Sequence, residues 1–139
     1  MLSPRPINGT IALTSTESTG GSFDVGAWTS NGKVEINFVD QPVDSELSLT
    51  ARTSNAPIAA LLHPAYEGKF RIATSIFRPS VIDLGSKDPS GQGRERSLKV
   101  GEGHGYRGLV NGSTWWGEEK GTNSSVNLSS SNAKAWLVL

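Results

Sequence analysis

The sequence predicts an all-β fold, and three observations carry this prediction. Sixteen glycines and seven prolines, together with Asn/Ser/Thr clusters, punctuate the chain, and this density of breaks leaves little room for a helix of normal length. Between the breaks, apolar and polar residues alternate with a period of two, which is typical of half-buried strands. A turn followed by an apolar strand also recurs along the chain, at Thr29–Phe38, Thr53–Leu62 and Ser130–Leu139.

The expected strands follow one another in order, and each is marked by apolar residues that alternate with polar ones. These residues are Ile11 and Leu13, then Val34, Ile36 and Phe38, then Leu47 and Leu49, then Phe70 and Ile72, and finally Val126 and Leu128. In residues 69–84, Thr74 and Ser75 occupy the turn position between two strands. Residues 85–97 are polar and rich in glycine, which predicts an exposed loop. We expect a single domain over residues 1–139.

The spacing of the recurring turns distinguishes between the possible all-β architectures. The units "NGTIAL", "NGKVEI" and "NAPIAA" begin at Asn8, Asn31 and Asn55, which are 23 and 24 residues apart. A fixed period in this range favours stacked coils, each made of a turn and strands. We therefore predict a short β-solenoid-like stack with a repeat of 23–24 residues, in which Asn31 and Asn55 hold equivalent turns one coil apart. A β-sandwich with three similar hairpins is the alternative, because closely spaced turns fit it too.

Composition excludes several classes of partner and chemistry. The 13 basic and 13 acidic residues give a formal net charge of zero, which removes the usual electrostatic basis for binding nucleic acid or an anionic membrane. The chain has no cysteine, so disulfides and thiolate metal sites are excluded. It also has no apolar run long enough for membrane insertion and no signal peptide. We expect a soluble chain, either cytoplasmic or secreted without a leader or after trimming.

Catalytic motifs are missing from the sequence. Of the two histidines, His63 follows an apolar strand and precedes a proline, so we expect it to close a strand end. His104 lies in a glycine-rich stretch that we expect to be a turn. No Gly-x-Ser-x-Gly nucleophile motif occurs, and the adjacent Glu118 and Glu119 would point to opposite faces of a strand. We therefore expect no enzymatic activity, no cofactor and no metal site.

Sugar binding is the function that the aromatic residues favour. Successive strand residues face opposite ways, so we expect Trp116 to point inward with Val110 and Trp115 to be exposed beside Asn111 and Ser113. An exposed indole can stack on a sugar ring, while amides, hydroxyls and the nearby Glu118 bond its hydroxyl groups. The alternative is that both rings cover the open end of the core. Four Asn-x-Ser/Thr sequons also occur, at Asn8, Asn111, Asn123 and Asn127.

Several motifs resemble a family of fungal domains of unknown function, which is distantly similar to bacterial putative-adhesin domains built as short right-handed β-coils. The resemblance covers residues 7–139. Its markers are Ser-Asn-Ala-Pro at 54–57, His-Pro-x-x-Glu-Gly at 63–68, Gly-Arg-x-Arg at 93–96 and Trp-Gly-Glu at 116–118. It implies a β-coil fold and brings no catalytic residues. Together with the aromatic residues, it favours a non-enzymatic, adhesin-like domain that binds carbohydrate as a lectin does. The alternative is a self-assembling or structural protein that forms homo-oligomers through its open strand edges.

Overall fold

The computed structural model describes residues 5–16, 20–102 and 108–139, and the prediction of an all-β fold is confirmed. The described residues form two sheets. Sheet I contains, in spatial order, β1 (Ile7–Ala12), β3 (Val34–Asp40), β5 (Ile58–Leu61), β11 (Ala135–Val138) and β7 (Ser80–Ile82). Sheet II contains β2 (Ser22–Trp28), β4 (Glu46–Thr53), β10 (Ser125–Ser130), β6 (Gly68–Thr74), β9 (Leu109–Trp116) and β8 (Arg96–Glu102).

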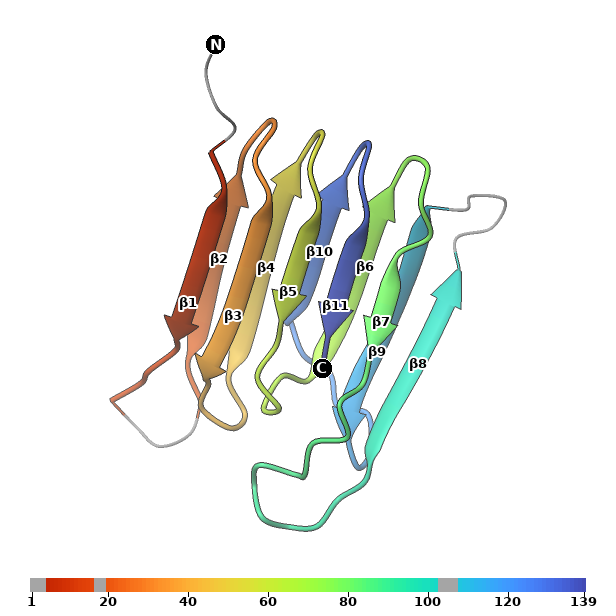
Figure 1. Ribbon diagram of the computed structural model, residues 1–139. Coiled ribbons are helices and arrows are strands. Elements are labelled where there is room, and N and C mark those ends of the chain that lie inside the picture. The colour runs from red at the N-terminus through yellow and green to blue at the C-terminus, as the bar shows by residue number, and fades with distance from the viewer. Residues whose placement is uncertain (1–4, 17–19, 103–107) are drawn as a thin grey trace.

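The chain passes from one sheet to the other at each step from β1 to β7, and the two sheets face each other (Figure 1). Every pairing in sheet I is parallel, and β2, β4, β10 and β6 are parallel in sheet II. The strands β8 and β9 form an antiparallel pair beyond β6. The last two strands in sequence are not last in space, because β10 lies between β4 and β6 while β11 lies between β5 and β7.

The apolar residues that alternate with polar ones in the sequence form the core between the two sheets. The predicted inward residues of β3, β4, β6 and β10 are all buried. In sheet I these are Val34, Ile36 and Phe38, and in sheet II they are Leu47, Leu49, Phe70, Ile72, Val126 and Leu128. Tyr66 is also fully buried, and its hydroxyl donates a 2.5 Å hydrogen bond to the carbonyl of Lys69. Burial raises the pKa of this phenol well above its usual value.

The Ser-Asn turns stack on one another as predicted for Asn31 and Asn55. Val34 pairs with Ile58, and Ile58 pairs with Ala135, so the three turns that precede these residues are neighbours. The Asn55 side-chain amide donates to Asn31 Oδ1, and that of Asn132 donates to Asn55 Oδ1, both at 2.6 Å. We call Asn31, Asn55 and Asn132 the asparagine ladder.

One detail of the predicted repeat was wrong. Asn8 does not begin an equivalent turn, because it lies within β1 and pairs with Glu35. Neither Asn31 nor Gly32 has a positive φ, since Asp44 is the one non-glycine residue with positive φ in the described chain and Gly32 is not among its positive-φ glycines. Gly32 is needed for space instead, because a Cβ there would lie 1.8 Å from the carbonyl oxygen of Arg5.

The polar loop predicted at residues 85–97 lies in a connection that runs from residue 83 to residue 95, because β7 ends at Ile82 and β8 begins at Arg96. None of the described segments is a helix with the length and hydrophobicity required to cross a membrane.

Candidate ligand-binding face

The outer face of sheet II collects polar side chains in straight rows. Since the inward residues of its strands are buried, the intervening residues point away from the core. The strand registers align these outward residues across all six strands. The first row is Asp24, Ser48, Ser125, Lys69, Ser113 and Lys99. The second row is Gly26, Thr50, Asn127, Arg71, Asn111 and Gly101.

A groove of about 350 Å³ lies where these rows cross β10, β6 and β9. It is lined by residues 69–71, 111–113 and 125–127. Hydroxyl and amide groups come from Ser113, Ser125, Asn111 and Asn127, and positive charge comes from Lys69 and Arg71. These groups can donate and accept hydrogen bonds at the groove.

An exposed indole lies on the same face of sheet II. A third row places Trp28 of the edge strand β2 beside Arg52 of β4, and 64% of Trp28 is exposed. A Cβ on Gly26 would lie 2.1 Å from Cη2 of Trp28, so the ring covers Gly26 in the second row. Three strand spacings, about 14 Å, separate this ring from Arg71.

The predicted sugar-binding residues are only partly brought together. Asn111 and Ser113 line the groove, whereas Glu118 is exposed on the connection after β9 and does not line it. The prediction that Trp115 is exposed was wrong, because only 3% of it is accessible. Its ring lines a separate cavity whose other walls come from residues 44–46, Glu67 and residues 120–122. The connections before β4 and after β9 therefore flank a ring that strand alternation alone would leave in solvent.

Trp28 is the site residue that sequence reasoning missed. The signal was present, because Phe23, Val25 and Ala27 alternate in β2 and leave the adjacent Trp28 on the opposite face. The prediction rests on the Trp115–Trp116 pair instead, because two adjacent indoles follow an Asn-Gly-Ser stretch.

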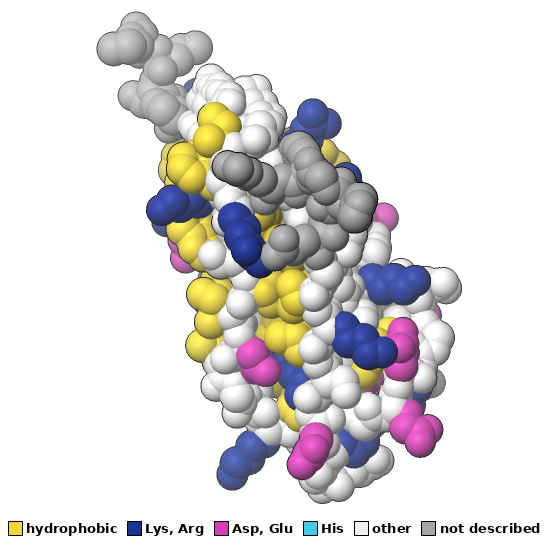
Figure 2. Space-filling view, turned by 90° about the vertical axis from the view of Figure 1, so that its right-hand side faces the viewer, with side chains coloured by type: hydrophobic (Ala, Val, Ile, Leu, Met, Phe, Trp, Pro, Cys, Tyr) yellow, Lys and Arg dark blue, Asp and Glu magenta, His cyan; other side chains and the backbone are white. Residues whose placement is uncertain are grey.

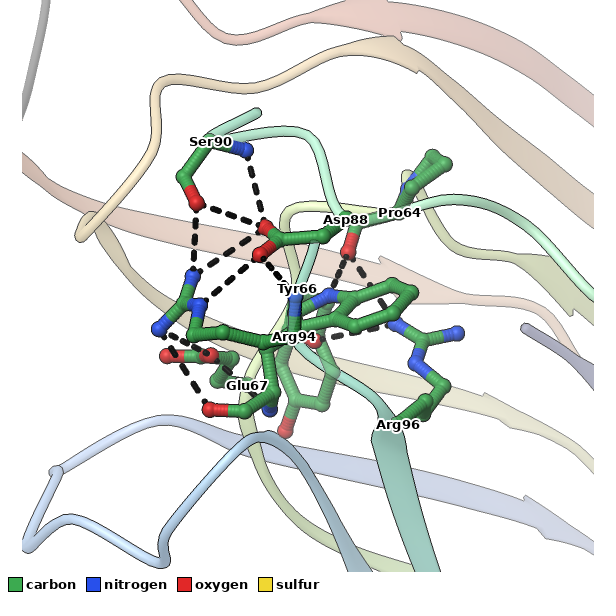
Figure 3. A network of polar contacts seen from close by, with 8 residues as sticks. Pro64, Tyr66, Glu67, Asp88, Ser90, Arg94 and Arg96 are labelled. Carbon is green, nitrogen blue, oxygen red and sulfur yellow. Dashed lines mark hydrogen bonds and ion pairs between the residues drawn. The ribbon is translucent and has the colours of Figure 1, made fainter. Parts of the chain in front are cut away.

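Trp116 is held in place by a network of polar contacts, part of which is drawn in Figure 3. Its indole Nε1 donates to the carbonyl of Pro64 at 2.7 Å, and its backbone N–H donates to Glu67 Oε1 at 3.0 Å. The Arg96 guanidinium lies 4.7 Å from the centre of the ring and donates through Nη2 to the same Pro64 carbonyl. Like Trp115, Trp116 is 3% exposed, so this ring has a structural role.

The same network fixes the polar loop before β8. Arg94 donates to the carboxylate of Asp88 through Nε at 2.9 Å and through Nη2 at 3.2 Å (Figure 3). These bonds, with those from Ser90, hold the pKa of Asp88 well below its usual range. Arg94 also reaches the carbonyl of Trp116 and lies 3.8 Å from Glu67. The loop is thus anchored to sheet II through its charged residues.

The remaining polar groups offer little catalytic chemistry. The backbone N–H of Ala65 donates to His63 Nδ1 at 3.1 Å, as suits a residue that closes a strand end, and burial lowers the pKa of this imidazole. His104 lies outside the described residues. Within residues 5–16, 20–102 and 108–139, no three His, Asp or Glu side chains are grouped so that they could hold a metal ion.

Comparison of the chain with known protein families, with curated proteins and with solved structures gave no match. The resemblance to fungal β-coil domains therefore stays an expectation from the sequence motifs.

Proposed function

We propose that the protein is a non-enzymatic, adhesin-like domain that binds a carbohydrate chain across the outer face of sheet II. The observation that carries this proposal is the combination of an exposed indole with aligned rows of hydroxyl and amide side chains on one face. An aromatic ring takes the C–H side of a sugar, and the polar rows bond its hydroxyl groups. Trp28 replaces Trp115 as the stacking ring, while Asn111 and Ser113 keep their predicted role.

We also infer that the two sheets are the walls of a short β-solenoid-like stack. Three facts support this inference: the chain changes sheet at each step from β1 to β7, its neighbouring strands in sheet I are parallel, and the Ser-Asn turns pile up in the asparagine ladder. Such a stack exposes a long, rigid wall, which is the kind of surface that repeat proteins use for extended ligands.

The test is a glycan array followed by titration of the best ligand. Trp28→Ala should weaken binding about tenfold, by analogy with the loss of stacking on an aromatic residue, and should leave the melting temperature nearly unchanged because the ring is exposed. Trp136→Ala is the matched control, since Trp136 lies on β11 in sheet I and alternates with buried neighbours. The proposal is wrong if no glycan binds, or if both variants weaken binding equally.

Head-to-tail self-association is the second candidate, and the open ends of the core favour it. The inward apolar side chains of the edge strands are only half-buried: Ile7 and Ile11 on β1, Phe23 and Val25 on β2, Val81 on β7 and Leu98 on β8. Figure 2 views the end that carries β7 and β8, and hydrophobic side chains gather there in a strip. Two antiparallel steps make β8 run in the same direction as β2. A second copy could therefore extend both sheets with parallel strands.

Light scattering against protein concentration separates this candidate from the first. Growth with concentration should be lost in Val100→Lys, which places a charge on β8 at the open end. Val39→Lys is the control, because both valines are 51% exposed and Val39 lies in the interior strand β3. A scattering signal that is independent of concentration removes self-association as a function.

A further inference from the structure

We propose that the ligand of the groove is an acidic polysaccharide, whose carboxylate or sulfate groups meet Lys69 and Arg71. This inference rests on the proposed carbohydrate-binding function and names the class of sugar. Among the described residues, the groove is lined by two charged side chains, both of them cations, and by no Asp or Glu. A neutral sugar would leave both of these charges without a counterpart, whereas oxyanions on a sugar would be bound by charge-assisted hydrogen bonds.

The two cations are available to a ligand. Lys69 and Arg71 are both exposed, and they lie two residues apart on the outer face of β6. Within the described part of the chain, neither of them forms an ion pair. This distinguishes them from Arg94, whose guanidinium is already occupied by Asp88 and Glu67.

Positive charge extends beyond the groove along the same rows. Arg52 lies beside Trp28 in the third row. Lys99 lies beside Ser113 in the first row, and its Nζ is already paired with Glu119 Oε2 at 3.6 Å. The single acidic side chain among the described residues of these three rows is Asp24, on the edge strand β2. The three rows carry four cations against Asp24 and the Glu119 that pairs with Lys99, so the surplus of positive charge is centred on Lys69 and Arg71. Such a local field attracts a polyanion and orients it on the face.

The arrangement suits a sugar polymer better than a nucleic acid. The rows cross the strands with a spacing of about 4.8 Å per strand. A chain lying along the first row therefore meets a hydroxyl or a cation at every step from Ser48 to Lys99. Single-stranded nucleic acid, by contrast, is held by several aromatic platforms along a basic groove. Trp28 is the one aromatic side chain in the rows within the described residues, and it stands about 14 Å from Arg71.

The experiment compares four polymers on the intact protein: polygalacturonate, dextran sulfate, neutral dextran and single-stranded DNA. At low ionic strength, we expect binding of the first or second polymer and no binding of neutral dextran. The double variant Lys69→Gln/Arg71→Gln should weaken that binding about tenfold or more, since hydrogen bonds to charged groups are among the stronger ones. Added salt should weaken polymer binding by the wild-type protein more than polymer binding by the double variant. The control is Lys33→Gln/Lys134→Gln, which removes two exposed cations outside the rows.

Each outcome has a defined meaning. Polygalacturonate binding identifies a uronate ligand, and binding of dextran sulfate alone identifies a sulfated one. If neutral dextran binds as tightly as the acidic polymers and the double variant binds unchanged, the acidic class is wrong while carbohydrate binding stands. If DNA binds as tightly as the acidic polysaccharides, the face is a general polyanion surface and this inference is wrong. If no polymer binds, and the glycan array also finds none, both proposals fail.

Discussion

Replacing Asn55 by alanine should destabilise the protein about twice as much as replacing either end of the asparagine ladder. Asn55 is the middle member, and its side chain makes two hydrogen bonds, one as donor to Asn31 and one as acceptor from Asn132. Asn31 and Asn132 each make one of these bonds. All three residues are exposed, so water replaces part of what each variant loses.

The magnitude follows from the number of bonds. A hydrogen bond contributes about 0.5–1.5 kcal/mol net, and exposure favours the lower half of that range. Asn55→Ala should therefore cost about 1–2 kcal/mol, and each end variant about half as much. Asn55→Asp should cost more than Asn55→Ala, because it replaces the donor to Asn31 Oδ1 with a charged acceptor.

Urea unfolding measures these differences. With a urea dependence of about 2 kcal/mol per molar, Asn55→Ala should lower the midpoint by roughly 0.5–1 M. Asn123→Ala is the control, since Asn123 is exposed on the connection before β10 and lies outside the ladder. If the middle and end variants shift the midpoint equally, or if none differs from the control, the ladder does not stabilise the stacked turns.

Three further predictions concern stability. Trp115→Ala and Trp116→Ala should each cost about 3–5 kcal/mol, as large truncations of buried side chains do, and a melting temperature within a degree of the wild type for Trp115→Ala would mean that its ring is exposed after all. Gly112→Val should cost more than about 2 kcal/mol, because its Cβ would lie 2.1 Å from the carbonyl oxygen of Lys99; normal expression and an unshifted urea midpoint would refute that close approach. Since burial lowers the pKa of His63, the folded state favours the neutral ring, so stability should be full above the unfolded pKa of about 6.5 and fall as the pH drops below it. His63→Asn should flatten that pH dependence of the urea midpoint, and equal slopes for both proteins would contradict the assignment.

The strands and the ladder were predictable because they depend on local alternation and on a repeated turn. The alternation of Val34, Ile36 and Phe38 predicts a strand whichever strands it pairs with, and the Ser-Asn turns at Asn31 and Asn55 differ little in sequence. The spatial order was not predictable in the same way. Strand pairing depends on contacts between segments far apart in the chain, and nothing local to β10 says that it pairs with both β4 and β6.

Part of the candidate site was predictable because it depends on the alternation within a single strand. Alternation in β9 placed Asn111 and Ser113 outward, and the structure brings them beside Lys69 and Arg71. It could not reveal that loops from elsewhere in the chain flank Trp115. Burial by a distant connection is a tertiary effect, and a strand pattern reports only which way a side chain points.

Two sequons bear directly on the groove. Asn111 and Asn127 both line it, whereas Asn8 and Asn123 are exposed outside it. A glycan attached to either lining residue would fill the space that the proposed ligand needs. Mass spectrometry of the protein from its native source should therefore find Asn111 and Asn127 unmodified if the groove binds sugar.

The order in which the strands are synthesised differs from their order in space, and this has a consequence for biosynthesis. During translation, β1 to β5 can stack on one another as they emerge. In contrast, β6 can pair only with β9, and β7 has no neighbour, until residues 125–139 appear. Until then, the unpaired edges of β4 and β5 are open to other chains, and such parallel edges are prone to aggregation. A ribosome pause or a nonsense codon after β9 would thus leave two separate groups of strands, β1 to β5 and β6 with β8 and β9, and not one shorter stack. Completion of the two sheets must therefore wait for translation of residues 125–139.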